Sequence, residues 1–595
     1  MSLILRPASF ALSLVSLCTI AAFAQKGSPP APAPRSIPSA PNYHNLADPD
    51  LQTDVRYQAF DKKPLTFKST AEEVLVPVVV VDKSGNPVAG LKKEAFRLQE
   101  NGRDQPISSV EEYRPTSTPL SPPGLGSNQV TNVNSGSTVE ARRLVIIVFD
   151  VLNTPFGEQA RARHALIKYV ADNLDPGSLY QLLALDRIGI HVLHDFTQNT
   201  ASLESALKAL TSKFSATNSV DSETLRALTT DPGQSAVPTI PLTATVARDQ
   251  EAIALQAFAS GEQAYAQYLQ AEAARTTMLA FQQIAARVSG VPGRKALIWV
   301  TAGFPFSVDP SSGAISEGYS FDFYQHTMQL LANQFIAVYP VDARGLLTLQ
   351  PDASFRLTRT ENAQIAGLLA AESNRNLDIQ NTMRAFADMT GGRAYVNKND
   401  MNACIKDAVK DGSAYYMLSY PLDRNNRKPG WRKINVRVAD YKVRARDGYY
   451  MTQTTVDPTS TARYDINQAL TSPFDYTGLP MRIMSNPPVA DGAKRKVTFA
   501  MTMPPKAVTL DATDNHHLHV DIAYVVRNTK GDDAGHNGVS YNTALNLQQL
   551  EQIEKQGLGY GDTLSLTPGS YNIRVVVRDN LTGKIGSALL PLDVK

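Results

Sequence analysis

The sequence has little cysteine and little net charge. The first excludes a fold held by disulfides, and the second argues against a nucleic-acid partner. Of its 595 residues two are cysteines, and only Cys404 lies beyond residue 24. A single thiol cannot form an internal disulfide, so packing alone must hold the fold together. We expect Cys404 to be a buried, apolar side chain. The formal net charge of +2 gives no electrostatic reason to expect a nucleic-acid partner.

A hydrophobic run long enough to cross a bilayer is also missing, so we expect no membrane span. Residues 1–24 are instead typical of a secretory signal peptide. Arg6 supplies the positive start, Ala8–Ala22 is largely apolar, and Ala22-Phe23-Ala24 fits a cleavage site between small residues. The pattern predicts an exported protein that begins at or near Gln25 and is periplasmic, secreted or held at the cell surface.

Motifs that would indicate catalysis are missing as well. The sequence contains no HExxH, no GxSxG and no P-loop, and we therefore expect no enzyme. A hydrolase whose catalytic groups meet only in the fold stays open as an alternative. His517 and His519 would share one face of a strand and could hold a metal ion, although an exposed strand face is the interpretation that we favour.

The stretch Leu144–Phe149 is apolar without alternation and ends at Asp150. Such a short run is typical of a strand that is buried on both faces, at the centre of a parallel sheet. Strands and helices then alternate to about residue 421, which predicts an α/β, doubly wound, mostly parallel sheet of the Rossmann-like kind. Its other strands are Leu179–Leu185 and Ile188–Leu193, an antiparallel pair, and then Ala296–Thr301, Ile336–Asp342 and Ala414–Tyr420.

Changes in composition divide the rest of the chain. The carboxyl-terminal part alternates apolar and polar residues between turns and predicts an antiparallel β-sandwich, Ig-like in its architecture. Segments rich in proline, serine and glycine predict spacers and linkers. The expected divisions are a signal peptide (1–24), a proline-rich spacer (25–65), a small β unit (66–113), a linker (114–139), the α/β domain (140–450) with an insertion (212–247), a second linker (451–475) and the sandwich (476–595).

Seven stretches together resemble the VWFA-related domain proteins of acidobacteria, a branch of the von Willebrand factor type A (vWA) superfamily. They follow the order of that family over about residues 73–450, and the resemblance implies an adhesion-like binding module. The matching stretches are 79–91, 149–155, 194–197, 292–305, 339–345, 390–395 and 444–449.

The resemblance also implies a divalent cation at the carboxyl edge of the sheet, held by a D-x-S-x-S run and by further Thr and Asp ligands. Asp150 matches the first position of the run, and Thr154 can replace its second serine. Leu152 and Ala302 stand where oxygen ligands are expected, so Mg²⁺ would be held weakly if at all. The alternative is that Asp150 and Asn153 cap the following helix and bond loop amides.

From these patterns we expect an exported, non-catalytic, protein-binding protein of the adhesion or scaffold type with a degenerate metal site and no certain cofactor. A divalent-cation-dependent adhesion receptor with a working metal site is the alternative. The protein partner and the oligomeric state are left open. The ligands of a metal would be Asp150 and Thr154, and the expected partner-binding face consists of Asp150, Asn153, Thr154, Thr301 and Asp342.

Overall fold

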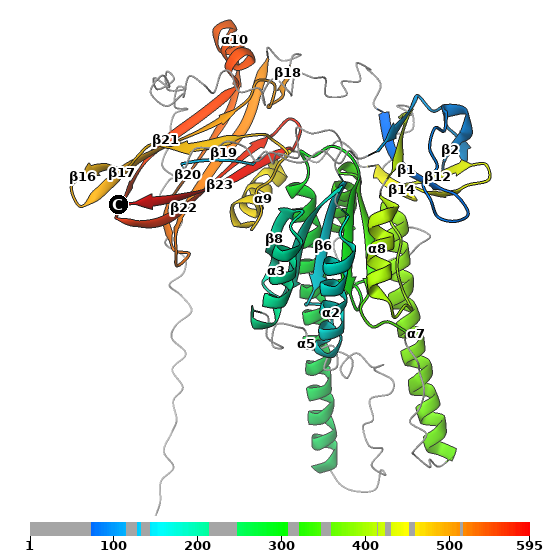
Figure 1. Ribbon diagram of the computed structural model, residues 1–595. Helices are drawn as coiled ribbons and strands as arrows, with labels where there is room; N and C mark the ends of the chain where they lie inside the picture. Colours follow the sequence, from blue (N-terminus) through cyan, green and yellow to red (C-terminus); the bar gives the residue numbers. More distant parts are fainter. Residues whose placement is uncertain are drawn as a thin grey trace, which may run out of the picture. The chain divides into compact units, whose positions relative to one another are not determined.

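A computed structural model describes most of the chain beyond residue 72. The expected signal peptide, the expected spacer and nearly all of the expected insertion 212–247 lie outside the described residues. All described residues belong to the unit Val55–Lys595 (Figure 1). The described ranges are 73–114, 128–132, 143–175, 177–213, 247–307, 321–346, 359–412, 414–422, 430–451, 458–511 and 516–595.

The α/β part contains a five-stranded sheet in the order β10-β9-β6-β7-β8. The pairs β6–β7, β6–β9 and β9–β10 are parallel, whereas β8 runs antiparallel to β7. The central place of the 144–149 run and the antiparallel pair after it are therefore confirmed. The strands are β6 (Arg143–Asp150), β7 (Ser178–Asp186), β8 (Gly189–Thr197), β9 (Lys295–Thr301) and β10 (Ile336–Asp342).

Two hydrophobic cores lie on the two faces of this sheet. Alternate residues of β6 enter each core: Ile146 packs with residues of α5, α6 and α7, and Ile147 packs with residues of α2, α3 and α8. A strand buried on both faces explains why the run is apolar without alternation. The helices are α2 (Phe156–Asn173), α3 (Thr200–Lys213), α5 (Ala247–Arg287), α6 (Phe321–Asn333), α7 (Arg359–Thr390) and α8 (Met401–Asp411).

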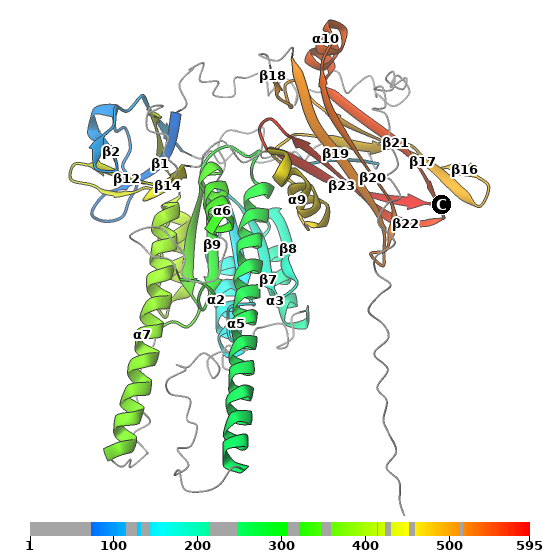
Figure 2. The ribbon, with the colours of Figure 1, turned by 180° about the vertical axis from the view of Figure 1, so that it is seen from behind.

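Helices α5 and α7 are much longer than the strands that they cover. At 1.5 Å per residue, the 41 residues of α5 span about 60 Å, whereas a seven-residue strand such as β9 spans about 23 Å. Both helices consequently extend past one edge of the sheet (Figure 2). In the described residues no helix is long and apolar enough to cross a membrane.

The small β unit is larger than the sequence predicts. The sequence pattern predicts residues 414–420 in the central sheet, but β11 pairs antiparallel with β1 and β4 instead. An apolar strand looks the same in sequence whichever sheet receives it, and about 45 residues are too few to bury a core alone. The two sheets of this unit, joined by one core, are β13-β1-β11-β4 and β14-β12-β2-β3. The strands are β1 (Glu73–Val81), β2 (Phe96–Glu100), β3 (Arg103–Asp104), β4 (Ser109–Tyr113), β11 (Tyr415–Pro421), β12 (Gly430–Val438), β13 (Lys442–Arg444) and β14 (Gly448–Met451).

The carboxyl-terminal part is built from antiparallel pairs throughout its described residues. Its two sheets enclose a common core of aliphatic and aromatic side chains. The elements are β15 (Arg482–Ser485), β16 (Val489–Asp491), β17 (Lys494–Met503), β18 (Leu510–Asp511), β19 (His517–Asn528), β20 (Asp533–Ala544), α10 (Leu547–Gln556), β21 (Leu558–Leu566), β22 (Gly569–Asp579) and β23 (Ile585–Val594).

Both expected linkers contain structural elements. In the first, β5 (Gln129–Thr131) joins a sheet of the carboxyl-terminal part by pairing with β15. The amide of Asn132 then donates to the carbonyls of Tyr476 and Leu479, at 2.7 Å each. In the second, α9 (Pro458–Thr471) packs on β22 and β23. These contacts are made with distant strands, so local composition could not reveal them.

Candidate functional site

Three of the five predicted site residues end neighbouring strands at the carboxyl edge of the central sheet, and the other two, Asn153 and Thr154, lie in the loop after β6. Asp150, Thr301 and Asp342 end the neighbouring strands β6, β9 and β10. Thr301 lies directly opposite Asp342 in the β9–β10 register, and the Thr301 hydroxyl donates to Asp150 Oδ2 at 2.8 Å. The parallel arrangement thus places these side chains at one edge of the sheet.

The Asp150 carboxylate is fully buried and is surrounded by donors from the protein itself. Oδ1 accepts from the backbone N–H of Asn153 at 2.9 Å. Oδ2 accepts from Nε1 of Trp299 at 2.9 Å and from Nδ2 of Asn153 at 2.9 Å, in addition to Thr301. Burial raises the pKa of Asp150, while the hydrogen bonds from Asn153, Trp299 and Thr301 act in the opposite direction. Both oxygens therefore serve the loop and strands around them.

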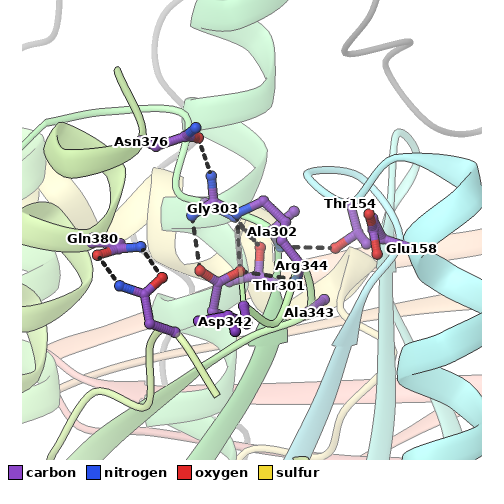
Figure 3. Close-up of polar contacts among 12 residues, drawn as sticks. Thr154, Glu158, Thr301, Ala302, Gly303, Asp342, Ala343, Arg344, Asn376 and Gln380 are labelled. Atoms are coloured by element: carbon purple, nitrogen blue, oxygen red, sulfur yellow. Dashed lines mark hydrogen bonds and ion pairs between the residues drawn. The ribbon is translucent and has the colours of Figure 1, made fainter. Parts of the chain in front are cut away.

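The two other key positions of the D-x-S-x-S run, Leu152 and Thr154, also make contacts within the protein. Leu152 is buried in the core between the sheet and α5. The Thr154 hydroxyl is 2% exposed and accepts from the backbone N–H of Ala302 at 3.1 Å (Figure 3). The side-chain oxygens of Asp150 and Thr154 do not fit an open Mg²⁺ site, because each accepts a hydrogen bond from within the protein. Among the described residues no three His, Cys, Asp or Glu side chains group as metal ligands.

Asp342 forms a second closed polar contact at the same edge. Its carboxylate accepts from Nε and Nη2 of Arg344, at 2.9 and 2.8 Å, and both side chains are buried. Nη1 of Arg344 donates to Asn376 of α7 at 2.8 Å (Figure 3). A bidentate guanidinium partner offsets the loss of hydration of this buried carboxylate. The contact fastens α7 to the end of β10.

The alternative role for Asp150 and Asn153 as a helix cap is only half right. They do bond a loop amide, as described above, but α2 has Pro155 at its N-cap and no side-chain cap bond. Proline is common at the start of a helix, because it lacks the N–H that would be left unpaired there. Farther along α2, Arg161 donates to the carbonyl of Ala343, which ties α2 to the loop after β10.

Four of the five residues expected to face a partner are buried: Asp150, Thr154, Thr301 and Asp342 are each at most 2% exposed. Asn153 is partly exposed. These side chains shape the edge from beneath and do not themselves form a surface. The expectation of a partner-binding face composed of them is therefore corrected, because strand-end polar groups that satisfy one another become part of the interior.

Exposed apolar side chains lie at the same edge and on the part of α5 that extends past it, and the sequence patterns do not reveal them. Phe156 follows β6, Ile188 lies in the turn after β7, and Leu346 follows β10, so the three mark the ends of three parallel strands. Leu377 lies beside Asn376, the partner of Arg344. We call the following set the apolar rim: Phe156 (63% exposed), Ile188 (82%), Tyr265 (59%), Tyr268 (60%), Leu346 (53%) and Leu377 (51%).

The remaining candidates are structural in character. Cys404 of α8 is a free, buried thiol in the core between this helix and the sheet, and burial raises its pKa. His517 Nε2 is paired with Oδ1 of Asn542 on the adjacent strand at 2.5 Å.

Isolated apolar residues on a surface are ordinary, but a group of them such as the apolar rim is typical of an interaction site. The rim was invisible in the sequence because its members are far apart in the chain.

Comparison with known proteins adds no family assignment. No family model and no curated protein matches the sequence. One similar solved structure is an aerotolerance-related membrane protein from Bacteroides fragilis NCTC 9343 with multiple mutations to serines; it is 13% identical with a TM-score of 0.22, over 45% of this chain and 98% of that chain. Another is the pilus adhesin SpaC from Lactobacillus rhamnosus GG, at 8% identity and a TM-score of 0.24, over 76% of this chain and 54% of that chain.

Proposed function

We propose that this chain is an exported, non-catalytic, protein-binding module of the vWA-like kind, and that it recognises its partner without a metal ion. The α/β architecture with helices on both faces and an aspartate at the end of the central strand supports a vWA-like reading. The observation that carries the proposal is the contrast at the carboxyl edge. There the Asp150 carboxylate is enclosed by donors, while large apolar side chains around it are exposed.

The apolar rim supplies what a protein interface requires. Phenylalanine, tyrosine and leucine side chains that are more than half exposed gain free energy when a partner removes them from water. Tyrosine is also among the residues that most often dominate binding energy. The polar groups beneath the rim are partnered within the chain, so a docking protein would not leave them without hydrogen bonds.

A cation-dependent mechanism would need the Asp150 oxygens to leave four internal donor groups. Each buried donor left without an acceptor costs about 1–3 kcal/mol, and Leu152 offers no oxygen in exchange. Recognition by a metal-bridged carboxylate is therefore the less favoured alternative. It predicts that a chelator abolishes binding, whereas the apolar rim predicts that a chelator has no effect.

The test is capture of envelope proteins by the full chain as bait, with the captured partner then titrated directly. We expect the same affinity in EDTA and in millimolar Mg²⁺. Leu346→Asp and Phe156→Asp should each weaken binding at least tenfold, because a charge placed in the interface must lose its hydration. Leu547→Asp is the matched control, since Leu547 is 86% exposed on α10. Loss of binding in EDTA would contradict the proposal, as would equal effects of the rim variants and the control.

A further inference from the structure

Residues from four of the seven matching stretches meet on the face of the sheet that α8 covers. None of them belongs to the predicted site residues or to the apolar rim, although the backbone of Tyr395 pairs with the end of β10. Each contributes a guanidinium or phenol group, which can bind a negatively charged oxygen. Together with the nearby Lys398 we call them the basic–aromatic cluster: Arg294 (stretch 292–305), Tyr339 (339–345), Arg393 and Tyr395 (390–395) and Arg444 (444–449).

Tyr395 lies between cations. The Cζ atom of Arg393 is 5.3 Å from the centroid of its ring, and Nζ of Lys398 is 5.6 Å from it. Arg444 is close enough to interact electrostatically with Tyr395, with Arg393 and with Arg294. Arg294 in turn stacks over the ring of Tyr339, with 5.9 Å between Cζ and the centroid. The side chains thus form one connected group.

Three donors in this cluster are buried and have no hydrogen-bond partner in the described part of the chain. They are Nη1 of Arg294, Nε of Arg444 and the hydroxyl of Tyr395. Arg294 and Tyr395 are only 7% and 2% exposed, so bulk water does not serve them freely. Burial also raises the pKa of Tyr395, which keeps its hydroxyl protonated and able to donate. Buried donors without acceptors are rare, and each calls for an explanation.

The local carboxylates do not supply the missing acceptors. Asp411 accepts from the hydroxyl of Tyr339 at 2.9 Å and pairs with Nη2 of Arg444. Asp407 lies 3.7 Å from Arg393. Arg294 donates through Nη2 to the carbonyl of Gly391 and has no carboxylate partner among the described residues. Asp400 is a third carboxylate close to Lys398 and Arg393. Four cations thus face three carboxylates, which leaves an excess of one positive charge.

We propose that the basic–aromatic cluster binds a small oxyanion, a phosphate or carboxylate group, at the unpartnered donors of Arg294, Tyr395 and Arg444. Such a group has several acceptor oxygens, and charge-assisted bonds to arginine are the strong ones. The Arg393 side chain is 48% exposed and that of Arg444 is 24% exposed, so the anion can approach from their side. The proposal is independent of the partner surface, because none of its residues belongs to the apolar rim.

The test uses the full chain and three probes: inorganic phosphate, sulfate and malonate, each against sodium chloride at equal ionic strength. We expect at least one probe to bind saturably by calorimetry and to raise the unfolding temperature. Tyr395→Phe should reduce its affinity about tenfold while leaving the probe-free unfolding temperature unchanged or higher, since the hydroxyl has no partner to lose. Arg393→Gln should also reduce affinity. Phosphate and malonate serve as the arms that separate a phosphate ligand from a carboxylate ligand.

Arg275→Gln is the control variant. The Arg275 side chain is 58% exposed on α5, so the substitution removes one positive charge away from the cluster. It should bind the probe like the natural sequence. Binding that is the same in Tyr395→Phe, Arg393→Gln and the control would place the anion elsewhere and overturn the proposal. The absence of any effect beyond sodium chloride with all three probes would overturn it as well.

Discussion

Asp150 at the end of β6 and Tyr395 beside β10 are both buried polar side chains, but their surroundings differ. The Asp150 carboxylate receives hydrogen bonds from three side chains and from one backbone amide. The Tyr395 hydroxyl has no partner among the described residues, although cations lie on its ring. A buried polar group that is fully partnered has a structural role, whereas one with unused capacity is a candidate for binding. Asp150 is thus a less promising binding site than Tyr395.

The largest effect should come from opening the closed edge at Asp342. The Asp342→Ala variant would leave the Arg344 guanidinium, 3% exposed, buried without its carboxylate. We expect a loss of about 3–5 kcal/mol in the free energy of unfolding of the α/β domain. Urea unfolding followed by tryptophan fluorescence measures it, since Trp299 lies in the central sheet. The double variant Asp342→Ala/Arg344→Met should recover much of the loss. A single variant as stable as the natural protein would show that this edge is not closed.

The next effect concerns Asp150 itself. The Asp150→Ala variant removes the acceptor for Trp299 Nε1, Thr301 and the side chain of Asn153. Donors left unpaired in the interior predict a loss of about 2–3 kcal/mol. Asp150→Asn keeps one acceptor oxygen and should lose less. Unchanged unfolding of Asp150→Ala in urea would mean that these bonds add nothing, and the comparison with Tyr395 would fail.

The smallest effect lies near the basic–aromatic cluster, at Asp388. Burial, with the neighbouring Asp447, raises the pKa of Asp388 to about 6 from 3.8. The folded protein then holds a proton that the unfolded chain releases, so stability falls as pH rises from about 4 to about 6. Because Asp388 is exposed at the surface, solvent screens most of this effect, and we expect Asp388→Asn to gain only about 1 kcal/mol at pH 7. The gain should vanish below pH 4. Asp378→Asn, an exposed aspartate on the same helix, is the control; an equal gain there would remove the argument.

Sequence patterns predicted the central sheet well because its signals are local. The apolar run at β6 and the tight turn between β7 and β8 each contain their own evidence. Strand β11 was assigned to the wrong sheet because an apolar run does not name its neighbour. Helix α9 was missed because its stability comes from packing on β22 and β23.

Sequence patterns indicate where the candidate site lies, but they do not indicate whether its polar groups are enclosed or open. The sequence placed Asp150 at the carboxyl edge and recognised Leu152 and Ala302 as departures from a metal-binding pattern. It could not show that the carboxylate is enclosed, because Trp299 and Thr301 are about 150 residues away in the chain. The apolar rim and the unpartnered donors of the cluster depend on tertiary contacts in the same way. Burial of a polar group is a property of the fold and not of a motif.

The central claim is that Asp150 is closed to metal ions, and the Mg²⁺ dependence of unfolding tests it most directly. A ligand at 100 times its dissociation constant stabilises the folded state by about 2.7 kcal/mol. We predict that the unfolding temperature of the full chain is the same in 5 mM EDTA and in about 10 mM Mg²⁺, a concentration at which a working site would give a clear rise. A rise in Mg²⁺ that disappears in Asp150→Asn would contradict the account and restore the metal-dependent alternative.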